Sequence, residues 1–77
     1  SYVLAEIETA KLNDAAKSIK GEEFTESCDI IEGGYNLLAV IRGDQFIQID
    51  KFILNRIMSL EGIVKIKEYP VIDIYGN

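Results

Sequence analysis

Hydrophobic positions near the start of the chain change from a period of two to the period of a helix. Residues 2–8 alternate in the way that a strand does, with apolar side chains at every second position. From residue 9 onward, apolar residues recur at i, i+3, i+4 and i+7, which predicts an amphipathic helix. These residues are Leu12, Ala15, Ala16 and Ile19. We expect Thr9 to cap this helix and Gly21 to end it.

Two more strands are predicted in the middle of the chain. Residues 24–31 mix apolar and polar side chains, which is typical of a strand at the edge of a sheet. Residues 35–42 carry hydrophobic groups on both faces and are expected in the middle of a sheet. Between them, Gly33 and Gly34 predict a two-residue hairpin turn, because glycine accepts the positive φ angles that this turn needs.

A second helix is predicted after Asp44, which we expect to cap it. Its apolar residues advance by steps of three and four along one stripe, and they are Phe46, Ile49, Ile53, Ile57 and Leu60. The stripe is widened by Ile47, Leu54 and Met58. A helix of this kind is suited to lie flat on a sheet, and Gly62 is expected to end it in the left-handed conformation.

The last elements complete a βαββαβ order. Residues 63–67 predict a fourth strand, Pro70 interrupts it, and residues 71–75 predict a short extra C-terminal strand. This order is that of an α+β, ferredoxin-like fold, here as a single domain over residues 1–77. Right-handed crossovers place the first and third strands at the centre of the sheet and both helices on one face.

The opposite face of the predicted sheet carries apolar residues that two helices on one side cannot cover. They are Leu4, Leu38 and Val40. Full burial would contribute about 1.5–3 kcal/mol for each, which is large for a domain of this size. We therefore expect a second copy to pack on this face, in a dimeric α/β barrel type of assembly.

Charge and composition narrow the possible partners. The net charge of −5 disfavours nucleic acid and anionic membrane surfaces as partners. With no histidine and one cysteine, sites that need imidazole are excluded, and we expect no metal and no cofactor. No apolar run is long enough for a membrane or signal segment, and a single Cys28 forms no internal disulfide, so we expect a cytoplasmic protein.

Two groups of charged residues have ordinary explanations. An acidic group matches no calcium loop and is expected to be a solvated edge. It consists of Glu22, Glu23, Glu26, Asp29 and Glu32. Lys65 and Lys67 share one face of the last main strand, where they protect a sheet edge or pair with acidic residues across a subunit boundary.

Three segments together resemble a known family. They are Ile31-Glu32-Gly33-Gly34-Tyr35-Asn36-Leu37-Leu38, the helix after Asp44, and Leu60-Glu61-Gly62-Ile63. From about Ser27 to Ile72 the chain resembles the effector-sensing domain, called RAM, of the Lrp/AsnC transcription regulators. Because the first strand begins at Tyr2, we expect the family's DNA-reading helix-turn-helix to be missing. The resemblance therefore implies a stand-alone sensing module.

The family's properties imply a site and several partners. In the family, sheets pair into dimers, dimers form rings that are commonly octamers, and effectors, usually amino acids, bind near the glycine turn. The implied ligand-binding residues are Gly33, Gly34, Tyr35 and Asn36. Glycine amides would face a carboxylate and the tyrosine ring would pack on the ligand. Asn36 replaces the family's aspartate, and Ile66 and Glu68 stand where the family tends to carry threonines.

Several functions stay open at this stage. We find no nucleophile beside a base, no phosphate-binding glycine loop and no metal-spaced ligands, so we expect no enzyme. The main hypothesis is an amino-acid-sensing module that forms a homodimer and a larger ring and joins full-length regulators of the family. The alternatives are an oligomerisation module whose glycine turn is an ordinary hairpin, a small dimeric-barrel enzyme acting on a small organic substrate, and an ACT-type regulatory domain.

Overall fold

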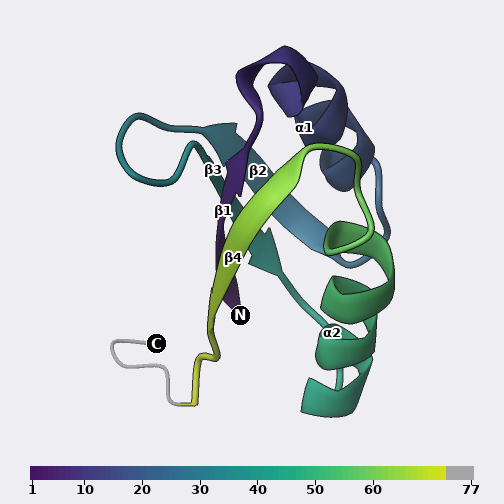
Figure 1. The fold of residues 1–77 in the computed structure, drawn as a ribbon. Coiled ribbons are helices and arrows are strands. Elements are labelled where there is room, and N and C mark those ends of the chain that lie inside the picture. Colours follow the sequence, from purple (N-terminus) through teal and green to yellow (C-terminus); the bar gives the residue numbers. More distant parts are fainter. Residues whose placement is uncertain (73–77) are drawn as a thin grey trace.

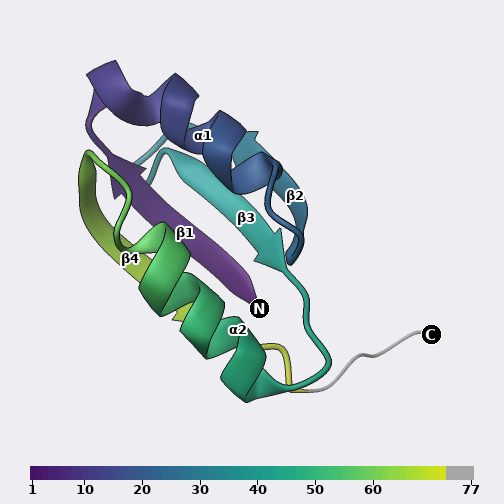
Figure 2. The same ribbon diagram turned by 90° about the vertical axis from the view of Figure 1, so that its right-hand side faces the viewer.

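The computed structural model describes residues 1–72, which form one antiparallel sheet with its helices packed on a single face (Figures 1 and 2). The elements are β1 (Tyr2–Ile7), η1 (Thr9–Lys11), α1 (Leu12–Lys20), β2 (Thr25–Ile30), β3 (Leu37–Ile41), α2 (Phe46–Phe52), η2 (Ile53–Ile57) and β4 (Ile63–Tyr69). The strand order β2-β3-β1-β4 confirms the ferredoxin-like fold with β1 and β3 at the centre. The extra C-terminal strand is not confirmed: Val71 and Ile72 belong to no strand, and residues 73–75 lie outside the described residues.

The core lies between the sheet and the helices. Alternate residues of β1 and β3 point into it, as the period of two predicts. The buried hydrophobic residues are Val3, Ala5, Ile7, Ala15, Ile19, Leu37, Ala39, Ile41, Ile49, Phe52, Ile53 and Ile57. Within residues 1–72, no helix has both the length and the apolar character needed to cross a membrane.

The entry into α1 differs from the predicted one. Thr9 does not cap the helix, because it lies inside the 3-10 turn η1 that precedes α1. The chain is instead held by its backbone, since the Glu8 N–H donates to the Gly62 carbonyl oxygen at 2.8 Å. Gly21 follows α1 as predicted, with an ordinary φ of −78°.

The predicted two-residue turn between β2 and β3 is wrong. The two strands are joined by residues 31–36, and the Ile31 N–H donates to the Asn36 carbonyl oxygen at 3.0 Å across the base of this loop. Of the two glycines, only Gly33 has a positive φ, at 133°. A two-residue type I′ turn needs positive φ at both central positions, and the two glycines do not adopt it here.

The start of α2 also differs from the prediction. The N-cap residue is Gln45 and not Asp44. The Gln48 side chain folds back, and its Oε1 accepts hydrogen bonds from the N–H groups of Asp44 at 3.0 Å and Gln45 at 3.3 Å. The Gln48 side chain, at the third position of the helix, thus satisfies the N–H groups of the N-cap residue and of the residue before it.

The apolar stripe of the second helix is narrower than predicted. Ile49, Ile53 and Ile57 are buried, together with Phe52, but Phe46 at the start of the stripe is exposed. The three residues expected to widen it, Ile47, Leu54 and Met58, are between 48% and 61% exposed. Only a narrow side of the helix therefore packs on the sheet. The helix α2 continues into the π-helical segment η2, where the Met58 N–H donates to the Ile53 carbonyl oxygen at 2.9 Å.

Gly62 connects η2 to β4 in the left-handed conformation, as predicted, with φ of 90°. A Cβ atom at this position would lie 2.7 Å from the Cβ of Lys11. The same corner is held by an ion pair between Lys11 Nζ and Glu61 Oε1 at 3.1 Å. The end of the second helical segment is thus fixed against the start of the first.

Candidate functional site

The sheet face opposite the helices carries the apolar residues that the sequence predicts there, and we call it the open face. The register pairs Leu4 with Leu38 and Tyr2 with Val40, and the side chains of Leu4, Leu38 and Val40 are half-buried. Figure 1 shows both helices on one side of the sheet and no helix or strand of residues 1–72 on the other. The open face is therefore an apolar surface that the described part of the chain leaves uncovered.

The loop of residues 31–36 places Tyr35 on the open face. The Tyr35 ring centroid lies 4.8 Å from Lys65 Nζ of β4, a cation–π contact. Lys65 Nζ also lies 3.6 Å from Glu6 Oε1 on β1. Two of these three side chains, those of Glu6 and Lys65, stand directly opposite each other in the strand register. The contact between Tyr35 and Lys65 therefore holds the loop on the side of the sheet that faces away from the helices (Figure 1).

Asn36 has a structural role that the sequence did not predict. Its Nδ2 donates to the Ile7 carbonyl oxygen at 2.7 Å, and its Oδ1 accepts from the Ile7 N–H at 3.0 Å. The side chain thus extends the pairing of β1 with β3 by replacing a backbone partner. A carboxamide bound in this way keeps only one further donor and part of its acceptor capacity for a ligand.

Gly33 and Gly34 form the exposed tip of the loop. A Cβ at Gly34 would meet nothing within 4 Å, so no crowding requires glycine there. The four predicted ligand-binding residues stay in one loop, with two at its tip, Tyr35 on the open face and Asn36 tied to Ile7. Their role in binding an effector remains a prediction.

Lys67 and Tyr69 of β4 also lie along the edge of the open face, next to Lys65. Lys67 Nζ lies 5.2 Å from the Tyr69 ring centroid. A side-chain hydrogen bond to Tyr69 raises the pKa of Lys67. The alternation of Lys65 and Lys67 indicates a shared face, but nothing in the sequence places Tyr35 beside them.

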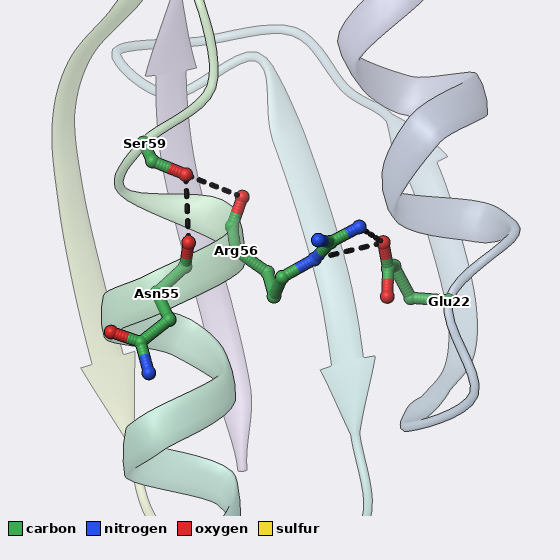
Figure 3. Close-up of polar contacts among 4 residues, drawn as sticks. All are labelled: Glu22, Asn55, Arg56 and Ser59. Carbon is green, nitrogen blue, oxygen red and sulfur yellow. Dashed lines mark hydrogen bonds and ion pairs between the residues drawn. The ribbon is translucent and has the colours of Figure 1, made fainter.

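A separate hollow of about 420 Å³ lies on the helical side. It is lined by the Phe24 and Phe52 rings, whose centroids are 5.6 Å apart, and by polar side chains at the rim. Arg56 crosses from η2 to Glu22, and its Nε lies 3.2 Å from Glu22 Oε1 (Figure 3). The residues come from segments more than twenty positions apart, so no local motif could have indicated this hollow.

Two glutamates of the acidic group pair with arginines, and a serine contacts the backbone beside Arg56. Ser59 Oγ donates to the carbonyl oxygen of Asn55 at 2.8 Å, in the turn that carries Arg56 (Figure 3). In the acidic group, Glu22 pairs with Arg56 and Glu26 pairs with Arg42. Among residues 1–72, no three His, Cys, Asp or Glu side chains gather where they could hold a metal ion.

Cys28 is half-buried and packs against the core from β2. It pairs in register with Ala39, which places it on the helical face of the sheet. Burial raises the pKa of the Cys28 thiol, and the neighbouring charge of Asp29 adds to this effect. A thiol of this kind behaves as a small hydrophobic residue and not as a nucleophile.

Comparison with solved structures supports the fold. TTHA0845 from Thermus thermophilus matches with a TM-score of 0.93 at 20% identity, over 99% of this chain and 95% of that one. The protein FFRP-DM1 matches with a TM-score of 0.81 at 17% identity, over 86% and 88% of the two chains. A hypothetical protein, PHS023 from Pyrococcus horikoshii, matches with a TM-score of 0.80 at 17% identity, over 86% and 80%.

These structures define the class of fold. The chain is an α+β protein of the ferredoxin-like type, and its fold resembles that of FFRP-DM1, an Lrp/AsnC-like protein. No family model matches the sequence, and no curated protein matches it. At this level of identity the likeness establishes the fold, and the function is argued from the site.

Proposed function

We propose that this chain is a non-enzymatic module that assembles through its open face and senses a small molecule, an amino acid, in the manner of Lrp/AsnC regulators. The observation that carries the proposal is the open face itself. Leu4, Leu38 and Val40 form its apolar middle, and tyrosine and lysine side chains lie along its margin. An apolar centre with a polar rim is the usual anatomy of a protein interface.

The position of the loop of residues 31–36 supports the sensing part of the proposal. Its glycine tip offers backbone N–H groups without side chains in front of them, which suits a carboxylate. Tyr35 supplies an aromatic surface, and Lys65 beside it supplies a positive charge. A carboxylate with a small apolar body is the ligand that this combination favours.

The proposed assembly follows the pattern of the resembled family. Dimers formed through the open face join into a larger ring, with an octamer as the expected size, and the effector binds between subunits. Full-length Lrp/AsnC regulators are the proposed protein partners. The fold likeness to FFRP-DM1 supports this part of the proposal.

A thermal-shift experiment tests ligand binding. The chain is heated with each of the twenty amino acids at millimolar concentration, and at least one is expected to raise the melting temperature. Tyr35→Ala should remove this response, whereas Phe46→Ala, which changes an exposed ring on α2, should keep it. A flat response of the unmodified chain to all twenty would refute the sensing part.

Light scattering tests the assembly. The proposal expects a mass that is a multiple of 8.6 kDa, with the dimer as the smallest stable unit at micromolar concentration. A monomer under these conditions would remove the basis of the proposal.

One observation favours a second candidate, an oligomerisation module that binds no effector. The Asn36 carboxamide is occupied by Ile7, so the loop has a structural reason to exist without a ligand. This candidate expects the multimeric mass together with no thermal response before or after Tyr35→Ala.

A further inference from the structure

Four residues cross the open face in a single row, one from each strand. The register pairs Asp29 with Leu38, Leu38 with Leu4, and Leu4 with Lys67. In strand order the row therefore runs from an acidic residue on β2, through two leucines, to a basic residue on β4. Its two ends carry opposite charges, and its middle is apolar.

The two charged ends cannot meet within one chain. Neighbouring strands lie about 4.8 Å apart, so three strand spacings separate the backbones of Asp29 and Lys67 by about 14 Å. Among the ion pairs of residues 1–72, neither residue takes part. Lys67 is instead held against the Tyr69 ring. The row thus presents an anion and a cation that no ion pair of the described residues neutralises.

We propose that a second copy of the chain covers the open face with its two-fold axis parallel to the strands, so that Asp29 pairs with Lys67 of the partner subunit. This inference rests on the proposed function, because it specifies how the proposed dimer is built. Rotation about such an axis reverses the strand order, so β2 of each copy lies over β4 of the other. The same ion pair then forms twice, as an interface with two-fold symmetry requires.

The apolar middle fits the same arrangement. With the order reversed, Leu4 lies over Leu38 of the partner subunit, and the reciprocal contact forms as well. Sheets packed face to face are about 10 Å apart, a gap that an extended lysine and an aspartate together can bridge. The adjacent row, Tyr69-Tyr2-Val40-Ser27, places the Tyr69 hydroxyl over a serine.

The charges also decide against the other face-to-face arrangement. A two-fold axis perpendicular to the strands and directed along the row keeps the strand order, so each residue of the row would lie over its own copy. Asp29 would then face the same carboxylate, and Lys67 the same amine. Like charges opposed in an interface are strongly unfavourable, which disfavours this arrangement relative to the axis parallel to the strands.

Charge reversal tests the pairing. Lys67→Glu and Asp29→Lys are prepared singly and together, with Lys17→Glu and Asp50→Lys as controls that change the same charges at exposed positions on the helices. Dimer dissociation constants are measured by analytical ultracentrifugation. Each row variant is expected to weaken the dimer by at least about tenfold relative to its control, because two like-charged contacts replace two ion pairs. The double variant should return to within about threefold of the unmodified chain, since both ion pairs form again in reversed order.

Carbodiimide cross-linking gives a second measurement that does not depend on how well the variants fold. An equal mixture of isotopically labelled and unlabelled chains is cross-linked, and linked peptides are identified by mass. The pair Glu6–Lys65, 3.6 Å apart in one chain, serves as the internal positive control. A link between Asp29 and Lys67 is expected in the dimer, with half of it joining a labelled to an unlabelled peptide.

The outcomes separate this inference from the proposed function. An unmodified chain that stays monomeric overturns both. A stable dimer whose single row variants dissociate no more readily than the controls overturns only the pairing. The pairing is likewise overturned if the double variant is as weak as the two single variants, or if Glu6–Lys65 is cross-linked and Asp29–Lys67 is not.

Discussion

The side chain of Asn36 binds both backbone groups of Ile7, donating to the carbonyl oxygen at 2.7 Å and accepting from the N–H at 3.0 Å. The two residues lie 29 positions apart, and the contact joins the base of the loop to the end of β1. A loop that carries the predicted ligand-binding residues is therefore fixed to a central strand by the Asn36 carboxamide, together with the hydrogen bond from the Asn36 N–H to the Ala5 carbonyl oxygen at 3.0 Å.

Asn36→Asp should destabilise the fold. At neutral pH the carboxylate still accepts from the Ile7 N–H, but it cannot donate, and it faces the Ile7 carbonyl oxygen. An unsatisfied and repelled acceptor of this kind costs about 1–3 kcal/mol. The free energy of unfolding, measured by urea denaturation at fixed protein concentration, should fall by this amount. Asn13→Asp, on the exposed side of α1, is the matched control, and an equal loss in both variants would contradict the prediction.

Gly62→Ala should be far more costly than Gly34→Ala. At Gly62 the backbone has φ of 90°, and the new Cβ would lie 2.7 Å from the Lys11 Cβ. Strain of the positive φ alone costs on the order of 1–2 kcal/mol, and the clash adds to it. At Gly34 the new Cβ meets nothing within 4 Å and φ is not positive, so the free energy of unfolding should stay within about 0.5 kcal/mol. Equal melting temperatures for the two variants would show that the corner at Gly62 is looser than described.

Phe52 and Phe46 offer a buried and an exposed aromatic residue in the same helix. Phe52 is 6% exposed and packs edge to face with Phe24, whereas Phe46 is 54% exposed. Phe52→Ala removes a buried ring and should cost about 3–5 kcal/mol, which is a large part of the stability of a domain this small. Phe46→Ala should change the free energy of unfolding by about 0.5 kcal/mol or less.

Because Phe52→Ala threatens folding altogether, Phe52→Leu is the informative companion. It keeps most of the volume and should cost about 1.5 kcal/mol or less, with a cooperative urea transition. A Phe46→Ala variant that loses as much stability as Phe52→Ala would contradict the burial pattern of α2.

Cys28 should make the stability depend on pH in the alkaline range. Burial raises the pKa of this thiol in the folded chain above its ordinary value of 9.0. The folded state then holds the proton when the unfolded state has lost it. This contribution to stability is complete below the pKa of the unfolded thiol and is lost as the pH rises through the folded pKa.

The measurement is a difference between two chains. The free energy of unfolding is determined from pH 7 to pH 10 for the unmodified chain and for Cys28→Ala. The advantage of the unmodified chain should shrink as the pH rises through about 9, because only that chain carries the thiol. A difference that is constant with pH would show that the thiol titrates alike in both states.

The strands and the open face were predictable because they depend on alternation along a single segment. Val3, Ala5 and Ile7 are buried at every second position, and Leu4 between them points to the other side, as a pleated strand dictates. Gly62 was predictable for a similar reason, since few residues other than glycine leave a helix in the left-handed conformation.

The features that escaped prediction depend on contacts between distant residues or on competing local ones. The wide loop of residues 31–36 is held by the two hydrogen bonds between the Asn36 side chain and the Ile7 backbone. No local sequence pattern reveals these bonds. Asp44 is an ordinary helix cap, but the helix begins one residue later, with Gln45 as its N-cap and the Gln48 side chain accepting from the Gln45 N–H. Leu54 and Met58 are apolar at helical spacing, yet they are 61% and 48% exposed.

In the candidate site, the sequence indicated Gly33, Gly34, Tyr35 and Asn36 through a resemblance to a family. It did not place Lys65 beside the tyrosine ring, because that contact joins the loop to a strand thirty residues later. Whether these residues hold an effector stays a prediction, and the thermal-shift experiment addresses it.

The row from Asp29 to Lys67 carries opposite charges at its two ends. In the proposed dimer, these charges favour pairing with a chain that has the same arrangement. A homologue in the same cell that carried the two charges in reversed positions would pair well with itself and poorly with this chain. Exchange of two surface residues would therefore be enough to keep two assemblies of the same fold separate, while leaving the leucines between them unchanged.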